Sequence, residues 1–83
     1  MSQSLNIRIE YFARFRERAG VPSEYVNTDA VNAAALYRQI AANHGFNLSQ
    51  AQLRVAVNDE FVGWDYALKN GDTVVFIPPV AGG

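Results

Sequence analysis

A single amphipathic helical segment between two strand-rich halves constrains the fold of this chain more than any other feature. The apolar positions recur at helical spacing, and the residues on this face are Ala33, Leu36, Tyr37, Ile40 and His44. Asn32 is the best candidate for the N-cap, with Asp29 as the alternative, and Gly45 ends the helix. A sheet covered by one helix, which is a two-layer α+β arrangement, buries such a face.

The strands are indicated by period-two alternation and by the turn residues between them. The first alternating segment, Leu5 to Tyr11, is followed by apolar residues at the spacing of a short helix over residues 12–19. Asn70-Gly71 is a tight-turn signal before a fully apolar run that is typical of a strand buried on both faces. The expected strands cover residues 5–11, 23–28, 53–57, 61–62 and 73–77.

Length and charge exclude several classes of protein. Eighty-three residues make one small domain, and a net charge of −1 gives no field that would hold nucleic acid or an anionic membrane. No apolar run approaches the roughly 20 residues of a membrane span. The segment that begins at Met1 has no signal-peptide pattern. We therefore expect a cytoplasmic protein without membrane or nucleic-acid partners.

The sequence ends in Gly82-Gly83 and contains no cysteine. Disulfides, thiolate metal sites and cysteine nucleophiles are therefore excluded, and any sulfur chemistry would have to use the C-terminus. Glycine has no Cβ, so this pair can enter a channel too narrow for other dipeptides, and Pro78-Pro79 ends the preceding strand. We expect a domain over residues 1–79 and a flexible tail over residues 80–83 that presents its carboxylate to another protein.

Other polar residues favour structural roles. His44 has no cysteine or histidine at ligand spacing, so a role at the helix end or on the surface is preferred over a metal site. Asp59-Glu60 and Asp72 are expected to be solvated turn residues. Trp64 and Tyr66 are expected to cover the end of the core. Three arginines form a small basic group on or near the first helix, and they are Arg14, Arg16 and Arg18. They are expected either to be a solvated face or to contact an acidic partner surface or the phosphates of a bound nucleotide.

Residues 71–83, Gly-Asp-Thr-Val-Val-Phe-Ile-Pro-Pro-Val-Ala-Gly-Gly, resemble the C-terminal segment of the MoaD family, the small sulfur-carrying subunits of molybdopterin synthase. Tyr11 to Glu17 and Val55 to Asn58 are similar to two further segments of that family. The resemblance implies a ubiquitin-like β-grasp fold. In that fold a mixed sheet of four to five strands, with the first and last strands side by side in the middle, is covered by one main helix.

The resemblance also implies a function as a sulfur carrier in molybdenum cofactor biosynthesis. A ubiquitin-activating-like enzyme would use ATP to adenylate Gly83, and a sulfurtransferase persulfide would convert it to a thiocarboxylate. The tail would then enter the large subunit of a heterotetramer and donate sulfur to cyclic pyranopterin monophosphate. The chain alone would be non-catalytic and would bind no metal or cofactor. The residues of the inserted tail would be Val80, Ala81, Gly82 and Gly83.

Phe12, Phe61 and Ile77 match apolar positions of the family's partner-binding face, although a core role competes at each. Pro78 is expected at the same interface. Large aromatic side chains at the centre of such a face often dominate affinity.

Three other functions remain open from the sequence. A sulfur carrier for thiamine biosynthesis is one, but those chains are usually shorter and lack the Pro-Pro-Val approach, so Pro78-Pro79 argues against it. A ubiquitin-like modifier joined through Gly83 to lysines of other proteins shares the same activation chemistry. A β-grasp adaptor with an inert tail is the third.

Overall fold

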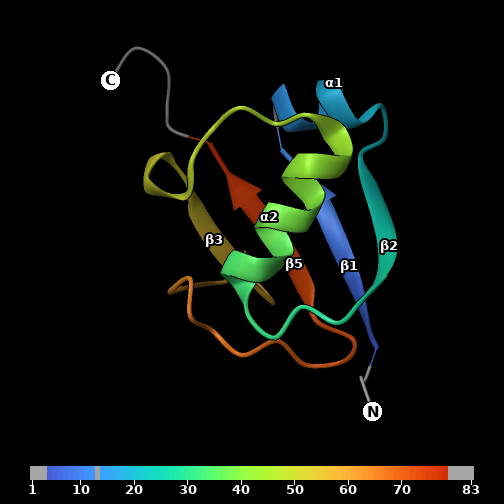
Figure 1. Cartoon of the computed structure of the whole chain (residues 1–83), viewed down its shortest axis with the longest axis vertical. Coiled ribbons are helices and arrows are strands. Elements are labelled where there is room, and N and C mark those ends of the chain that lie inside the picture. The colour runs from blue at the N-terminus through green and yellow to red at the C-terminus, as the bar shows by residue number, and fades with distance from the viewer. Residues whose placement is uncertain (1–3, 13, 79–83) are drawn as a thin grey trace.

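A five-stranded mixed sheet covered on one face by one long helix makes up the computed structural model, which describes residues 4–12 and 14–78 (Figure 1). The predicted α+β, ubiquitin-like β-grasp class is confirmed. The elements in chain order are β1 (Leu5–Tyr11), α1 (Arg14–Ala19), β2 (Ser23–Thr28), α2 (Ala33–His44), the 3-10 turn η1 (Gln50–Gln52), β3 (Arg54–Val57), β4 (Glu60–Val62) and β5 (Thr73–Ile77).

The strand order is β2-β1-β5-β3-β4, so the first and last strands lie together in the middle of the sheet. β1 and β5 run parallel, with Arg8 opposite Thr73 and Tyr11 opposite Phe76, whereas the other neighbours are antiparallel. Figure 1 shows β5 between β1 and β3, with α2 crossing the near face of the sheet. The central position of β5 fixes the point at which the chain leaves the sheet.

The two ends of α2 are set by the residues that the sequence indicated. Asn32 is extended (φ −145°), and its side-chain oxygen accepts a hydrogen bond from the Ala35 amide at 2.8 Å. Gly45 has φ +70°, a left-handed conformation that suits glycine, and the Phe46 amide donates back to the Ala41 carbonyl. These local contacts fix where the helix begins and ends.

The core lies between α2 and the sheet. Alternate residues of the central strands point at the helix, and the largest fully buried side chains are Phe76, Ile7, Ile9, Leu36, Ile40, Val55 and Val74. Trp64 stacks on Phe76 with ring centroids 6.0 Å apart, and Tyr37 meets the same ring edge-on at 5.0 Å. Trp64 and Tyr66 pack against the core as partly buried side chains, as expected. Burying each large side chain contributes roughly 1.5–3 kcal/mol.

Asp72 is buried rather than solvated, so the expectation of a solvent-facing turn residue was wrong. Its side chain is only 5% exposed, and its carboxylate accepts hydrogen bonds from the Lys69 amide at 2.8 Å and the Asn58 side chain at 3.0 Å. The Asn58 side chain in turn accepts from the Thr73 amide at 3.0 Å. Because these bonds join the β3–β4 turn to the start of β5, they satisfy a carboxylate that burial would otherwise penalise.

None of the helices in the part of the chain that the structure describes is long and apolar enough to cross a membrane.

Candidate functional site

The face of the sheet opposite α2 has no covering layer among the described residues, and we call it the open face. Val74 and Phe76 of β5 point at α2, so Val75 and Ile77 point at the open face, where both are half-buried. The prediction that residues 73–77 are buried on both faces is therefore correct for the helix side only. The reason is that the chain supplies one covering helix for a central strand that is apolar on both sides.

An apolar stripe crosses the open face from β4 to β5. The strand registers place Phe61 opposite Ala56 and Ala56 opposite Val75, so the three residues form a row across adjacent strands. Phe61 is 61% exposed although it belongs to a regular strand. Ile77 lies one step further along β5, and we define the apolar stripe as Ala56, Phe61, Val75 and Ile77.

Phe12 extends this surface beyond the end of β1. It follows Tyr11, which points into the core, and it is 53% exposed. Phe12 and Val75 line a hollow of about 380 Å³, together with Arg8, Glu10, Tyr11, Arg16, Pro22, Ser23 and Asp59. The structure therefore brings Phe12, Phe61 and Ile77, three residues predicted for a partner interface, to one surface.

The other predicted site residues lie at or beyond the end of β5. Pro78, also predicted for the interface, is buried in the structure. Val80, Ala81, Gly82 and Gly83, predicted as the inserted tail, lie outside the described residues, and so does the predicted domain boundary after residue 79. The described part of the chain ends at Pro78, directly after Ile77, which is the last residue of β5 and a member of the apolar stripe.

The open face carries one arginine in an ion pair and another in contact with an aromatic ring. Arg8 and Glu10 form an ion pair at 3.6 Å on β1. On β3 the guanidinium carbon of Arg54 lies 4.5 Å from the centroid of the Phe61 ring, which is a cation–π contact. Arg54 is also opposite Ile77 in the β3–β5 register, so it stands where β5 ends. Sequence reasoning missed Arg54, although it occupies the outward phase of an alternating strand next to an apolar run.

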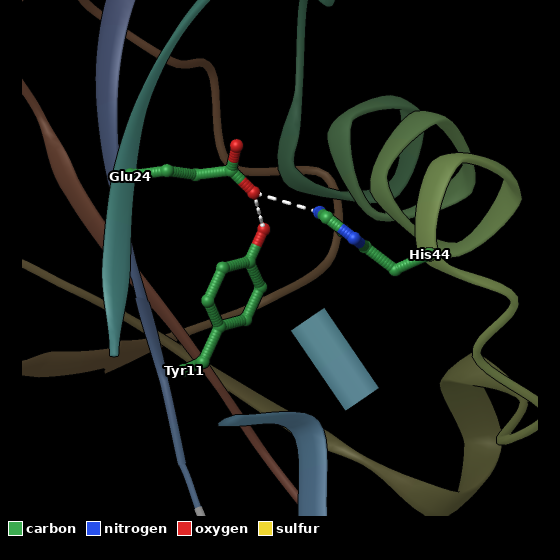
Figure 2. Close-up of polar contacts among 3 residues, drawn as sticks. All are labelled: Tyr11, Glu24 and His44. Carbon is green, nitrogen blue, oxygen red and sulfur yellow. Dashed lines mark hydrogen bonds and ion pairs between the residues drawn. The ribbon is translucent and has the colours of Figure 1, made fainter. Parts of the chain in front are cut away.

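A second polar group lies on the helix side of the sheet, where it joins three elements (Figure 2). The Tyr11 hydroxyl donates to Oε2 of Glu24, and Nε2 of His44 lies 2.7 Å from the same oxygen. The His44 ring is stacked on Phe46 and meets Tyr11 edge-on, with both centroid distances at 5.5 Å. We call Tyr11, Glu24 and His44 the carboxylate cluster.

Burial and these hydrogen bonds shift two titrations in the carboxylate cluster. Burial, with a further contribution from the Glu24 carboxylate, raises the pKa of Tyr11 far above its ordinary value. Partial burial alone would raise the pKa of Glu24, but the bonds from Tyr11 and His44 outweigh it and hold that pKa below its usual range. Glu24 is therefore an ionised acceptor that ties β1, β2 and the end of α2 together.

The only histidine of the chain, His44, has a structural role in the carboxylate cluster, where it contacts Glu24. His44 lies at the end of α2 as predicted, and among residues 4–12 and 14–78 no group of three histidine, cysteine or acidic side chains could hold a metal ion. Sequence reasoning did not find Glu24 as its partner. The available signal was that Glu24 shares the inward phase of β2 with Val26 and Thr28, where a carboxylate needs donors.

Comparison with known proteins gives one consistent family. The model of the ThiS family matches residues 9–83. The molybdopterin synthase sulfur carrier subunit of Escherichia coli K12 is 36% identical over 80 residues, which cover 93% of this chain and 99% of that protein.

Two solved structures extend the comparison. The HVO 2177 protein of Haloferax volcanii superposes with a TM-score of 0.80 at 29% identity, covering 96% of this chain and 88% of that one. A chain from the complex of subunits 1 and 2 of the molybdopterin-converting factor of Helicobacter pylori has the same fold, with a TM-score of 0.64 at 22% identity, covering 95% of this chain and all of that one. The similarity to the E. coli molybdopterin synthase sulfur carrier subunit and the family match both span nearly the whole length, and this chain therefore belongs to the ThiS family.

Proposed function

We propose that this protein is the sulfur carrier subunit of a molybdopterin synthase and that the carboxyl group of Gly83 carries the sulfur. The observation that supports this most is the family match, which continues through residue 83 and so includes Gly82-Gly83. The E. coli relative is named as a molybdopterin synthase sulfur carrier subunit, and its alignment with this chain covers 99% of its length. With no cysteine in the chain, no side-chain thiol competes for this role.

The open face supports a large-subunit partner. β5 lies in the middle of the sheet, and its apolar residues Val75 and Ile77 face away from the only covering helix among the described residues. Phe12 and Phe61 add exposed aromatic rings on either side of them. A contiguous apolar surface on a small domain is typical of a protein interface. The H. pylori relative of this fold was solved in complex with a second subunit.

The chemistry at Gly83 follows from the low reactivity of a carboxylate. We propose that an adenylating partner lets this carboxylate displace pyrophosphate from ATP, which makes AMP the leaving group on the acyl carbon. The terminal sulfur of a sulfurtransferase persulfide then attacks the acyl carbon and displaces AMP, which gives an acyl disulfide. A second thiol, which acts as the two-electron reductant, cleaves the S–S bond, forms a disulfide with the sulfurtransferase cysteine and leaves the thiocarboxylate on Gly83. The ionised thiocarboxylate sulfur is a soft nucleophile that the large subunit directs at cyclic pyranopterin monophosphate. This chain supplies the reactive terminus and the docking surface, and the partner supplies the acid, the base and the anion-binding groups.

Intact-mass measurement tests this function directly. The chain is co-expressed with its adenylating enzyme and sulfurtransferase, and we expect it to be heavier by the mass difference between sulfur and oxygen. A variant lacking Gly83 serves as the control, and we expect no mass shift and no molybdopterin formation while its circular dichroism spectrum stays unchanged. If the Gly83-deleted chain still supports molybdopterin formation, the proposal is wrong. Remnants of this chain in isopeptide linkage to lysines of other proteins would indicate a modifier instead.

A further inference from the structure

We propose that Arg54 is a positioning residue whose guanidinium binds a carboxylate on the surface of the large subunit and so fixes how the C-terminal residues approach that subunit. The inference rests on the proposed function and names a residue and a chemical contact that the function alone does not require. It follows from three observations on β3, β4 and β5.

The first observation is the contact between Arg54 and Phe61. The guanidinium carbon lies 4.5 Å from the ring centroid, and both side chains are exposed on the open face. A guanidinium over an aromatic ring keeps its N–H groups available at the edge, where they can bind a carboxylate through two parallel hydrogen bonds. The ring holds the guanidinium in place before the partner arrives, so less side-chain freedom is lost on binding.

The second observation is the charge balance of the open face. Arg8 is neutralised by Glu10 at 3.6 Å, whereas Arg54 has no carboxylate at ion-pair distance among the described residues. Arg54 therefore presents an uncompensated cation at the rim of the apolar stripe. An acidic side chain on the large subunit, placed next to the surface that contacts Phe61, would complement this arrangement.

The third observation is the position of Arg54 relative to the end of β5. Arg54 is opposite Ile77, the last residue of that strand. The seven residues from Ile77 to Gly83 can span at most about 25 Å when extended. A contact fixed at Arg54 therefore limits where the terminus can reach in the partner. The positive charge of Arg54 therefore affects how the large subunit binds and how the C-terminal residues approach it. In this proposal Arg54 makes no contact with the reacting atoms.

The experiment compares the full chain, carrying its thiocarboxylate, with the variants Arg54→Ala, Arg54→Lys and Arg54→Glu. Binding to the purified large subunit is measured by titration at low and high salt, and sulfur transfer is measured to obtain kcat and KM for the carrier. We expect Arg54→Ala to weaken binding about tenfold at low salt, with a smaller loss at high salt because the contact is screened. KM should rise with kcat unchanged.

Comparison of the three Arg54 variants separates the effect of the positive charge from the effect of the planar shape of the guanidinium. Arg54→Lys should recover part of the affinity, because it keeps the cation without the planar fork, and Arg54→Glu should bind more weakly than Arg54→Ala. Arg38→Ala, which removes an exposed arginine of α2 on the opposite side of the sheet, is the matched control and should bind as the unchanged chain does. Thermal unfolding of each variant checks that the fold is retained.

Wild-type affinity and salt dependence in Arg54→Ala would overturn the inference, as would a fall in kcat at unchanged KM. Either result would leave the proposed function standing, provided that deletion of Gly83 abolishes sulfur transfer in the same assay. Retained transfer after that deletion would instead refute the proposed function.

Discussion

Glu24 is a single carboxylate that accepts from donors on two other elements. Its pKa is held below the usual range in the folded protein, so it binds fewer protons there than in the unfolded chain. The sign follows from linkage: this carboxylate stabilises the fold above its unfolded pKa, and the stabilisation is lost as the pH falls through the lower folded value. The contribution of Glu24 to stability therefore changes only under acidic conditions, below its ordinary pKa of 4.5.

Glu24→Gln should lower the free energy of unfolding by roughly 1 kcal/mol at pH 7, since it weakens the bonds to Tyr11 and His44. Urea unfolding at pH 7 and at pH 3 checks this, and the difference from wild type should be smaller at pH 3, because that pH lies below the unfolded pKa and part of the stabilisation by the carboxylate is already lost there. Glu17→Gln, at an exposed position of α1, is the control. An equal loss at both pH values would contradict the assigned titration.

Tyr11 gives the opposite dependence at high pH. Its folded pKa is raised, so the neutral phenol stabilises the fold up to the unfolded pKa of about 10, and this contribution is lost as the pH rises further. Tyr11→Phe should be less stable than wild type by about 1 kcal/mol at pH 8, with the gap narrowing above pH 10. Unfolding in urea across this range measures the gap. Tyr25→Phe, at an exposed tyrosine, should show no such gap at any pH.

At the scale of elements, α2 was the most predictable part of the chain. Its apolar spacing, the cap at Asn32 and the left-handed Gly45 are all local signals, and each is found in the structure. The pairing of β1 with β5 is different, because residues near opposite ends of the chain meet there and periodicity does not choose between partners. That pairing could be expected only through the resemblance of residues 71–83 to a known family.

The cap of α2 supplies a direct test of this element. Asn32→Ala should destabilise the protein by about 1 kcal/mol, because the Ala35 amide loses its acceptor. Chemical denaturation monitored by circular dichroism measures the change. Asn43→Ala removes the same amide group from an exposed site in the last turn of α2 and should change stability by less than half as much. Equal effects of the two substitutions would show that the Asn32 cap contributes nothing of its own.

The candidate site could be predicted only in part, because the apolar sequence of β5 does not show what covers each of its two faces. Its apolar run indicated burial on both faces, yet nothing in one sequence says whether the second cover comes from the same chain or from a partner. Phe12, Phe61 and Ile77 were expected at an interface. The strand registers bring Phe61 and Ile77 to one face, and Phe12 lines a hollow together with Val75 of that face. Glu24 and Arg54 depend on contacts between separate strands, so local patterns did not assign them.

At the scale of the whole molecule, the open face should behave as a binding surface rather than as part of the core. Phe61→Ser should weaken binding to the large subunit at least about tenfold while leaving the free energy of unfolding within about 1 kcal/mol of wild type, because the ring is already exposed. Val31→Ser, at an apolar residue that is 72% exposed between β2 and α2, is the control and should bind normally. Equal binding of both variants would remove Phe61 from the interface.

The central claim is that the domain is a carrier and that Gly83 holds the transferred sulfur. The most direct test follows the intact mass of thiocarboxylated chains during one turnover with the large subunit and cyclic pyranopterin monophosphate. We predict that each chain reverts to the mass of the carboxylate form only when both are present, with molybdopterin appearing in proportion. Molybdopterin formation while the chains keep their sulfur would contradict the account.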